Sequence, residues 1–246
     1  MISFASVALT LAVILNTKNV MASSREIFKA DFDRIASLPD YQSRHQGPYE
    51  SFLLKHVPLR CDEALEIGCG MGAFSRLLAE RARSVSAIDF SPEMIRLATA
   101  RSSDFANIEF LRADVTETEF PREQFDCIVS IATLHHLPIR ATLEKLKSAL
   151  RPNGILIVHD LFQSDGLFDL AVSALAHATW VGRQFIKFGR LRPPRAVREA
   201  WKEHGRHDTY LTLEEVRKLR NDLFPNAVVK RHLLWRYSLI WRKPED

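Results

Sequence analysis

The feature that most constrains this chain is a glycine-rich turn between an expected strand and an expected helix. The apolar run 64–67 leads into Gly-Cys-Gly-Met-Gly at residues 68–72, and a helical pattern follows from Ala73. Glycine lets the backbone turn tightly and approach a ligand without a Cβ clash, and the helix N-terminus offers free N–H donors. This order of elements predicts a strand, turn and helix unit whose turn binds a small ligand.

Short apolar runs alternate with helical patterns over most of the chain, which is the rhythm of a parallel sheet. The expected strands are Ala64–Ile67, Val85–Ile88, Ile108–Leu111, Asp126–Ser130 and Gly154–Val158, the last after a Pro152-Asn153-Gly154 turn. The expected helices are Ala73–Ala82, one that starts at Pro92 after Ser91, and Arg140–Leu150. A helix at Leu213–Leu223 then precedes two β-rich runs, Val228–Leu234 and Tyr237–Trp241, close enough for a hairpin. We therefore expect an α/β fold, a Rossmann-like, doubly wound, mostly parallel sheet with an antiparallel C-terminal hairpin.

The 246 residues fit one such unit with additions at its start and in its middle. Residues 1–20 contain an apolar run that is too short to span a bilayer and lacks the preceding Lys or Arg of a signal peptide. We expect a mis-called start ahead of Met21, with a signal or an anchor as the alternatives. Residues 21–60 are expected to form a helical lid, or else a helix that only covers one sheet face. The cofactor-binding domain would span residues 61–246, with a helical insertion at about 162–208.

The basic character of the chain lies in one segment. The formal net charge is +4, yet residues 183–206 alone hold eight Lys or Arg against Glu199 and Glu203, so the rest is slightly acidic and nucleic acid is not an expected partner. An apolar helical stripe precedes this segment, so 183–206 would suit peripheral membrane contact or an amphiphilic anionic acceptor. A solvated basic face is the alternative. The three cysteines lack disulfide or metal-ligand spacing, so we expect a cytoplasmic protein.

Three successive expected strands end in an acid. Glu66 precedes the first glycine by two residues, where a carboxylate suits a ligand that carries an ammonium and a sulfonium and is awkward beside a pyrophosphate. Asp89 could accept hydrogen bonds from both ribose hydroxyls, and Asp114 could accept from an adenine amino group. The acids therefore favour a cationic nucleoside cofactor over a dinucleotide, which the glycines alone would also fit.

Further motifs follow the glycine turn in order. They are Ile88-Asp89-Phe90-Ser91-Pro92-Glu93-Met94, Ala113-Asp114, the strand 125–130 followed by Leu134-His135-His136-Leu137-Pro138, and Leu150-Arg151-Pro152-Asn153-Gly154. Together with residues 65–72 they resemble the successive motifs of the class I S-adenosylmethionine-dependent methyltransferases, especially the broad small-molecule group that includes ubiquinone and menaquinone C-methyltransferases. The match covers roughly residues 63–160. Each motif is weak alone, whereas the ordered set is specific.

The resemblance implies S-adenosyl-L-methionine as cofactor and a small-molecule methyl acceptor. It implies that the loop 68–72 holds the methionine part, Asp89 the ribose and Asp114 the adenine amino group, while Phe90 and Met94 flank the ring. Ser130 and Ile131 would give backbone contacts near the sulfonium. The expected cofactor-binding residues are Glu66, Gly68, Cys69, Gly70, Gly72, Asp89, Phe90, Met94, Asp114, Val115, Ser130 and Ile131, with Cys69 filling a small slot rather than reacting.

Methyl transfer from a sulfonium is an in-line displacement, so the protein mainly holds the acceptor and the methyl carbon together and excludes water. A base helps when the acceptor is a hydroxyl or an acidic carbon, and His135 and His136 follow the fourth expected strand on the cofactor side. Both are candidate catalytic residues, with capping or packing as the alternative role. His204, His207 and Asp208 resemble metal ligands only by residue type, because this spacing in a charged helix usually faces solvent, so no metal is expected.

Two other functions fit parts of the sequence. The glycine pattern alone would allow an NAD-dependent oxidoreductase, although no tyrosine has a lysine four residues on, as the short-chain type needs. A non-catalytic cofactor-binding protein could keep the same fold. Residues 130–133 read Ser-Ile-Ala-Thr, where an adenine-N6 methyltransferase would have Asn/Asp-Pro-Pro-aromatic. We therefore expect O- or C-methylation of a small molecule, with an amphiphilic or lipidic acceptor as one option and those two functions as alternatives.

Overall fold

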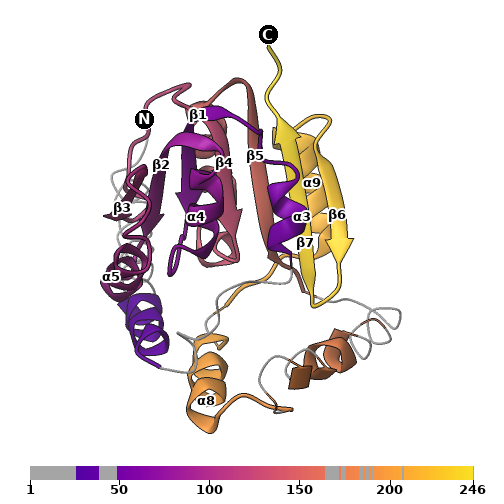
Figure 1. Cartoon of the computed structure of the whole chain (residues 1–246). Helices are drawn as coiled ribbons and strands as arrows, with labels where there is room; N and C mark the ends of the chain where they lie inside the picture. The colour runs from indigo at the N-terminus through magenta and orange to yellow at the C-terminus, as the bar shows by residue number, and fades with distance from the viewer. Residues whose placement is uncertain are drawn as a thin grey trace, which may run out of the picture.

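A seven-stranded sheet forms the centre of the molecule in the computed structural model (Figure 1). The structure describes residues 26–38, 49–163, 172, 176–182, 185–186, 189, 191–206 and 208–245. The strands are β1 (Cys61–Ile67), β2 (Ala82–Asp89), β3 (Ile108–Arg112), β4 (Phe125–Ile131), β5 (Leu150–Leu161), β6 (Val228–His232) and β7 (Arg236–Arg242). Their order is β3-β2-β1-β4-β5-β7-β6, parallel from β3 to β5 and antiparallel at β7 and β6. This confirms the expected mostly parallel sheet with its C-terminal hairpin.

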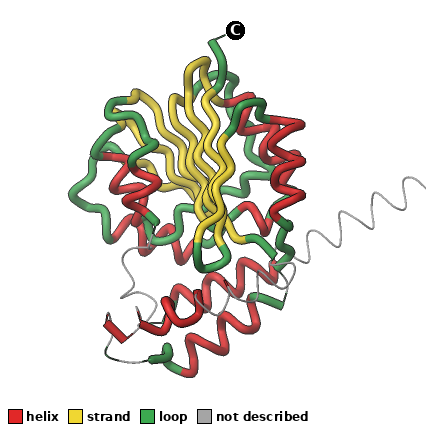
Figure 2. Tube along the Cα trace, turned by 90° about the vertical axis from the view of Figure 1, so that its right-hand side faces the viewer, coloured by secondary structure: helices red, strands yellow, loops and turns green. Residues whose placement is uncertain are grey.

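Helices cover both faces of the sheet, as the edge-on view shows (Figure 2). One apolar core joins α3 (Glu50–Leu54) and α4 (Ala73–Ala79) to the sheet through buried residues such as Leu53, Phe74 and Val129. The opposite core joins α6 (Ile139–Ala149) and α9 (Leu213–Leu223) through Leu146 and Val216. The strands β1 and β4 therefore lie between two apolar layers, which is why they read as continuous apolar runs.

Local signals set several helix starts. Pro92 opens α5 (Pro92–Ala100), and the Ser91 hydroxyl before it accepts a hydrogen bond from the Met94 backbone N–H. Thr212 and Glu215 form a capping box at the start of α9, so this helix begins and ends where the sequence predicts. Several boundaries differ from the expected ones, two of them for a clear structural reason. The helix α4 ends at Ala79 because Ala82 already pairs with Cys61 in the sheet, and residues 152–154 belong to β5, where Asn153 with a φ of 63° adjoins a register shift.

A further group of helices lies beyond the lower end of the sheet (Figures 1 and 2). It includes a helix over residues 26–36 and α8 (Arg195–His204), and Phe28 and Phe32 of the first meet His204 of the second at ring-centroid distances of 5.8 and 4.6 Å. Residues 1–20, for which we expect a mis-called start, lie outside the described residues. Most of the apolar stripe before residue 189 lies outside them too. Within the described part of the chain, no helix has the length and apolar character needed to cross a membrane.

Candidate active site

The glycine turn joins β1 to α4 and has a left-handed backbone at all three glycines. The φ angles of Gly68, Gly70 and Gly72 are 71°, 52° and 72°. A Cβ on Gly68 would stand 2.0 Å from the Thr133 Oγ1 atom, and one on Gly72 would meet the Phe110 ring at 2.9 Å. A Cβ on Gly70 would meet nothing within 4 Å. The turn is thus packed at both ends and open in the middle, where a ligand can approach the backbone.

Asp89 ties the open part of this turn to the next helix. One carboxylate oxygen accepts the Gly70 N–H at 2.8 Å, and the other accepts the Ser91 N–H at 2.9 Å. Burial raises the pKa of Asp89, an effect that the backbone donors Ser91 and Gly70 oppose. The Ser91 hydroxyl also donates to Asp33 at 2.5 Å, which connects this corner to the helix over residues 26–36. The expected ribose-binding acid therefore lies directly beside the open glycine.

Glu66 lies under the turn and is only 2% exposed. Its carboxylate accepts a hydrogen bond from the Ser75 hydroxyl of α4 at 2.5 Å. Burial raises the pKa of Glu66 to about 8, because desolvation of the carboxylate outweighs the Ser75 hydrogen bond. A cationic ligand at the turn would favour the ionised form of this acid, so the residue fits the positive end of the expected cofactor.

The remaining expected cofactor residues line the same edge of the sheet with different exposure. Asp114 follows β3 and accepts hydrogen bonds from the Thr116 N–H and hydroxyl at 2.8 and 2.6 Å. Val115 and Met94 are buried, and Met94 packs against Ala36. Phe90 and Ile131 are half-buried. Among these residues Asp114, Phe90 and Ile131 are partly accessible, while the side chains of Met94 and Val115 are buried.

Two small side chains near the turn are buried. Ser130 is 1% exposed, and its hydroxyl has no hydrogen-bond partner among the described residues. Cys69 is 5% exposed, and burial raises the pKa of its thiol well above the usual range. A thiol in that state is a poor nucleophile, which agrees with the expected slot-filling role.

The turn after β4 brings His135 against a carboxylate that the sequence analysis missed. The His135 Nδ1 atom lies 2.6 Å from Asp160 Oδ1, and the His135 backbone N–H donates to Asp160 Oδ2 at 3.1 Å. Asp160 is the last but one residue of β5 and is 1% exposed. A carboxylate oxygen accepts from a ring N–H, so in the neutral imidazole this contact favours the tautomer with the hydrogen on Nδ1 and the lone pair on Nε2. Thr133, two residues before His135, packs against Gly68, whose missing Cβ makes room for the threonine side chain.

His136 belongs to a second group of polar and aromatic side chains. Its Nδ1 atom lies 3.2 Å from Asp208 Oδ1, and its ring lies 4.9 Å from both the Phe28 and the His204 rings between centroids. Burial lowers the pKa of His136, which keeps the ring neutral. Tyr210 donates its hydroxyl hydrogen bond to the other oxygen of Asp208.

The expectation that His204 and Asp208 face solvent was wrong. The exposed fractions of their side chains are 2% and 4%, because α8 turns this face toward Phe28 and Phe32. His207 lies outside the described residues. Ligand atoms of His135, His136 and Asp208 lie within 4.8 Å of one another, a spacing that could also hold a cation. No sequence pattern links the two histidines to their acids. Asp160, beside His135, and Asp208, beside His136, lie far along the chain and reach the histidines only in the folded protein.

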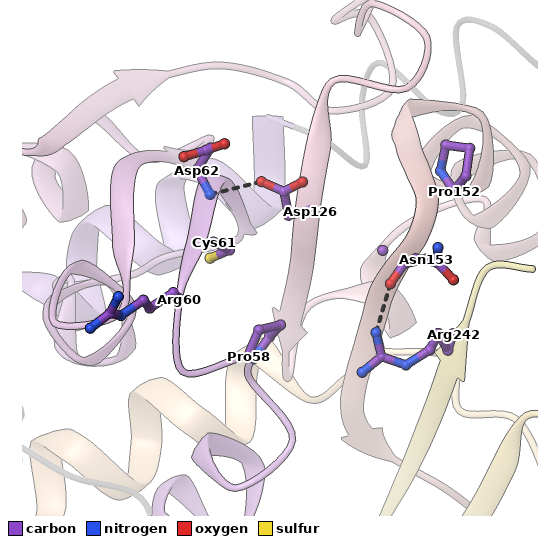
Figure 3. A pocket seen from close by; sticks show the side chains of 9 residues that line it. Pro58, Arg60, Cys61, Asp62, Asp126, Pro152, Asn153 and Arg242 are labelled. Atoms are coloured by element: carbon purple, nitrogen blue, oxygen red, sulfur yellow. Dashed lines mark hydrogen bonds between the residues drawn. The ribbon is translucent and has the colours of Figure 1, made fainter. Parts of the chain in front are cut away.

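A shallow cavity of about 470 Å³ lies at the opposite edge of the sheet (Figure 3). Its lining includes Arg60, Cys61, Asp126 and Arg242 at the amino ends of β1, β4 and β5 and the end of β7. Asp126 there accepts hydrogen bonds from the Asp62 and Glu63 N–H groups and from Arg151. Ligands of doubly wound sheets bind outside the carboxyl ends of the strands, so this cavity is on the wrong edge for the cofactor.

Comparison with known proteins agrees with this geometry. A family model described as a methyltransferase domain matches residues 64–154. An uncharacterized methyltransferase of Mycobacterium tuberculosis is 30% identical over 200 residues, covering 80% of this chain and 94% of the relative. A ubiquinone biosynthesis O-methyltransferase of Xanthomonas axonopodis pv. citri is 28% identical over 189 residues, covering 71% and 74%. The N-methyltransferase NodS of Bradyrhizobium japonicum, solved with S-adenosyl-L-homocysteine, shares the fold with a TM-score of 0.61 at 19% identity, covering 89% and 99%.

Proposed function

This chain belongs to the class I S-adenosylmethionine-dependent methyltransferases, and we propose that it methylates a hydroxyl group or an acidic carbon of its small-molecule acceptor with His135 as the base. The observation that carries the proposal is the hydrogen bond between His135 Nδ1 and Asp160. A histidine oriented by a buried carboxylate is the arrangement that general-base catalysis uses. Its turn lies against the glycine loop through Thr133 and Gly68, so the base stands beside the cofactor. An oxidoreductase is not the activity of this family.

The cofactor supplies an electrophilic methyl group on a sulfonium when it is bound. We assign its ribose to Asp89, its adenine amino group to Asp114 and its methionine part to the loop 68–72, with Glu66 beneath. His135 accepts the proton of the acceptor on Nε2, and Asp160 stabilises the imidazolium that forms. The remaining expected residues, Cys69, Phe90, Met94, Val115, Ser130 and Ile131, shape the walls.

The helix over residues 26–36 and α8 form the lid of this site. Asp33 reaches the Ser91 hydroxyl on the cofactor side, while Phe28 packs on His136 on the acceptor side. Such a cover excludes water from the reacting groups. The outer face of α8 carries the exposed residues Trp201, Arg198 and Lys202, so we assign to segment 183–206 a peripheral contact with anionic membrane surfaces, from which an amphiphilic acceptor could enter.

The test is methyl transfer from labelled S-adenosylmethionine to a panel of phenols, quinols and hydroxy acids, followed by kinetics on the best acceptor. His135→Gln should lower kcat roughly 10²–10⁴-fold, the usual contribution of a general base, while S-adenosylhomocysteine affinity stays within about twofold. Asp160→Asn should lower kcat in the same direction. The matched control is His56→Gln, at a histidine on the α3 side of the sheet, which should change neither.

Two results would overturn the assignment of the base. One is a His135→Gln variant that turns over as fast as the parent chain. The other is loss of turnover on dialysis against EDTA with full recovery on adding Zn²⁺, because His135, His136 and Asp208 would then serve as metal ligands.

A further inference from the structure

Arg236 begins β7 at the same edge of the sheet as the histidines. It pairs with Leu161 in the last rung of the β5 and β7 ladder, directly beside the Asp160 and Tyr237 pair. The turn before it is tight, since Leu234 and Trp235 have φ angles of 61° and 56° and the Phe162 N–H donates to the Trp235 carbonyl at 3.1 Å. The fold therefore fixes where this guanidinium leaves the backbone.

Arg236 is half-buried, and no hydrogen bond or ion pair joins its guanidinium to another described residue. Burial lowers the pKa of Arg236, and the acid that opposes this effect most is Asp160. That acid is already used, because its two oxygens take His135 and the Leu161 N–H. A half-buried guanidinium that no side chain of the protein pairs is available to bind an anionic group of a ligand.

Other arginines of this chain that are partly buried have partners. Arg151 meets Asp126 at 2.9 Å, Arg81 donates to the Val57 carbonyl at 2.9 Å, and Arg220 donates to the Ala227 carbonyl at 2.8 Å. Arg236 departs from this pattern at the edge where the acceptor must bind. The difference indicates a partner that is not part of the chain.

The surroundings of Arg236 suit an anion. His159 lies two residues before Leu161 on β5, so its side chain and that of Arg236 share one face of the sheet. It is 2% exposed, and neither ring nitrogen has a hydrogen-bond partner in the described part of the chain. Burial lowers the pKa of His159 to about 3, so the ring is neutral and can donate one N–H. Tyr210, whose ring lies 5.2 Å from that of His135 between centroids, is a further electrostatic neighbour of Arg236.

We propose that Arg236 binds an oxyacid group, a carboxylate or a phosphate, on the methyl acceptor. This inference rests on the proposed function, and it adds the substrate class: an acid whose methylated group lies a few bonds away. Asp160 lies between the residue proposed to bind the acid group and the residue proposed to act as base. It contacts His135, and it is next to the Arg236 pair in the sheet. The planar fork of arginine matches both oxygens of a carboxylate or phosphate.

The test measures binding to the protein saturated with S-adenosylhomocysteine, at constant ionic strength, by calorimetry. The probes are 4-hydroxybenzoate, its neutral methyl ester, and phenyl phosphate. We expect at least one acid to bind at least tenfold more tightly than the ester, a preference lost in Arg236→Gln and partly kept in Arg236→Lys. The control Arg140→Gln, at an arginine paired with Asp222 on the surface, should keep it. Preference for phenyl phosphate over hydroxybenzoate would identify the acid as a phosphate. Equal binding of acids and ester, no binding of either acid, or a preference that survives Arg236→Gln would overturn the proposal.

A second measurement needs no acceptor. Because no described residue pairs with this half-buried guanidinium, Arg236→Met should not lower the Tm of the ligand-free protein. A lower Tm would mean that the guanidinium is already paired within the protein and would contradict the proposal. The proposal that His135 is the base is tested separately, because His135→Gln should lose turnover but keep the preference for acids. An acid preference without any effect of His135→Gln on turnover would reject the base and leave the Arg236 site standing.

Discussion

The acidic side chains at the two edges of the sheet differ in whether the protein pairs them with positive charge. At the amino edge Asp126 is paired, with two backbone N–H donors and Arg151 around it, and its pKa is lowered. At the carboxyl edge burial raises the pKa of Glu66 and Asp89, and no lysine or arginine pairs with either among the described residues. The acid at the amino edge is therefore paired within the protein, whereas the acids at the ends of β1 and β2 have no cation beside them, and a cationic cofactor would supply one.

The acid at the amino edge therefore contributes to stability, whereas the acids at the carboxyl edge are suited to ligand binding. A paired surface acid adds a little stability and needs nothing else. Buried acids without a cation cost stability in the free protein, and the cost falls when a ligand of opposite charge binds.

The largest effects on stability and cofactor binding are expected from alanine at Gly68, which is tightly packed, and at Gly70, which is open. Gly68→Ala would place a Cβ 2.0 Å from Thr133 at a φ of 71°, and should lower the free energy of unfolding by about 2–4 kcal/mol. Gly70→Ala meets no atom within 4 Å, so it should cost only about 1 kcal/mol but block the ligand. Urea unfolding and S-adenosylhomocysteine titration distinguish them. A Gly70→Ala variant with unchanged affinity would show that the open middle of the turn is not the cofactor path.

A somewhat smaller effect is expected from Glu66→Gln, and it depends on pH. Because the pKa of Glu66 is raised to about 8 in the folded state, the folded chain holds a proton that the unfolded chain releases above about pH 4.5. The stability of the parent chain should therefore fall relative to Glu66→Gln as pH rises from 5 to 7.5, by roughly 3 kcal/mol in total. Tm measured across this range tests the sign. A constant difference between the two proteins would mean that Glu66 is ionised in the folded state.

The same acid predicts a proton linkage in cofactor binding. Near pH 7, S-adenosylmethionine should release about one proton when it binds the parent chain and none with Glu66→Gln, because the positive ligand favours the carboxylate. Calorimetry in buffers of different ionisation enthalpy counts these protons. Equal proton release in both proteins would assign the linkage to another group.

The smallest effect is expected on the outer face of α8. Arg198→Ala removes one exposed charge and should weaken binding to vesicles that contain anionic lipid by about fivefold, close to 1 kcal/mol per basic residue. The affinity for S-adenosylhomocysteine should stay the same. Co-sedimentation with anionic and with neutral vesicles checks this, with Arg140→Ala as the control. Equal sedimentation of all three proteins would reject the membrane contact of segment 183–206.

Much of the sheet and the cofactor edge could be predicted because their signals are local. The apolar run before Gly68, the Pro92 start and the Thr212 capping box each determine structure within a few residues. The alternation of apolar runs and helical patterns predicted the parallel part of the sheet, and the two closely spaced β-rich runs predicted its antiparallel C-terminal hairpin. These features need no knowledge of which distant segments meet.

The acceptor side could not be predicted because its residues meet only in three dimensions. Asp160 looks like an ordinary polar residue at the end of an apolar strand, and nothing near it in the sequence points to His135. His204 reads as solvent-facing in a basic helix, yet the helix over residues 26–36, far away in the chain, covers it. Arg236 became notable only once its lack of a partner was visible.

The most direct test of the contrast between the edges is a titration of S-adenosylhomocysteine into the parent chain, Asp89→Ala and Asp126→Ala, together with urea unfolding of each. Asp89→Ala should weaken binding by roughly 1–3 kcal/mol, as the loss of a charged acceptor does, with little change in stability. Asp126→Ala should lower the free energy of unfolding by about 1–2 kcal/mol and leave binding within about twofold. An Asp89→Ala variant that binds as tightly as the parent chain, or an Asp126→Ala variant that binds as weakly as Asp89→Ala should, would contradict this account.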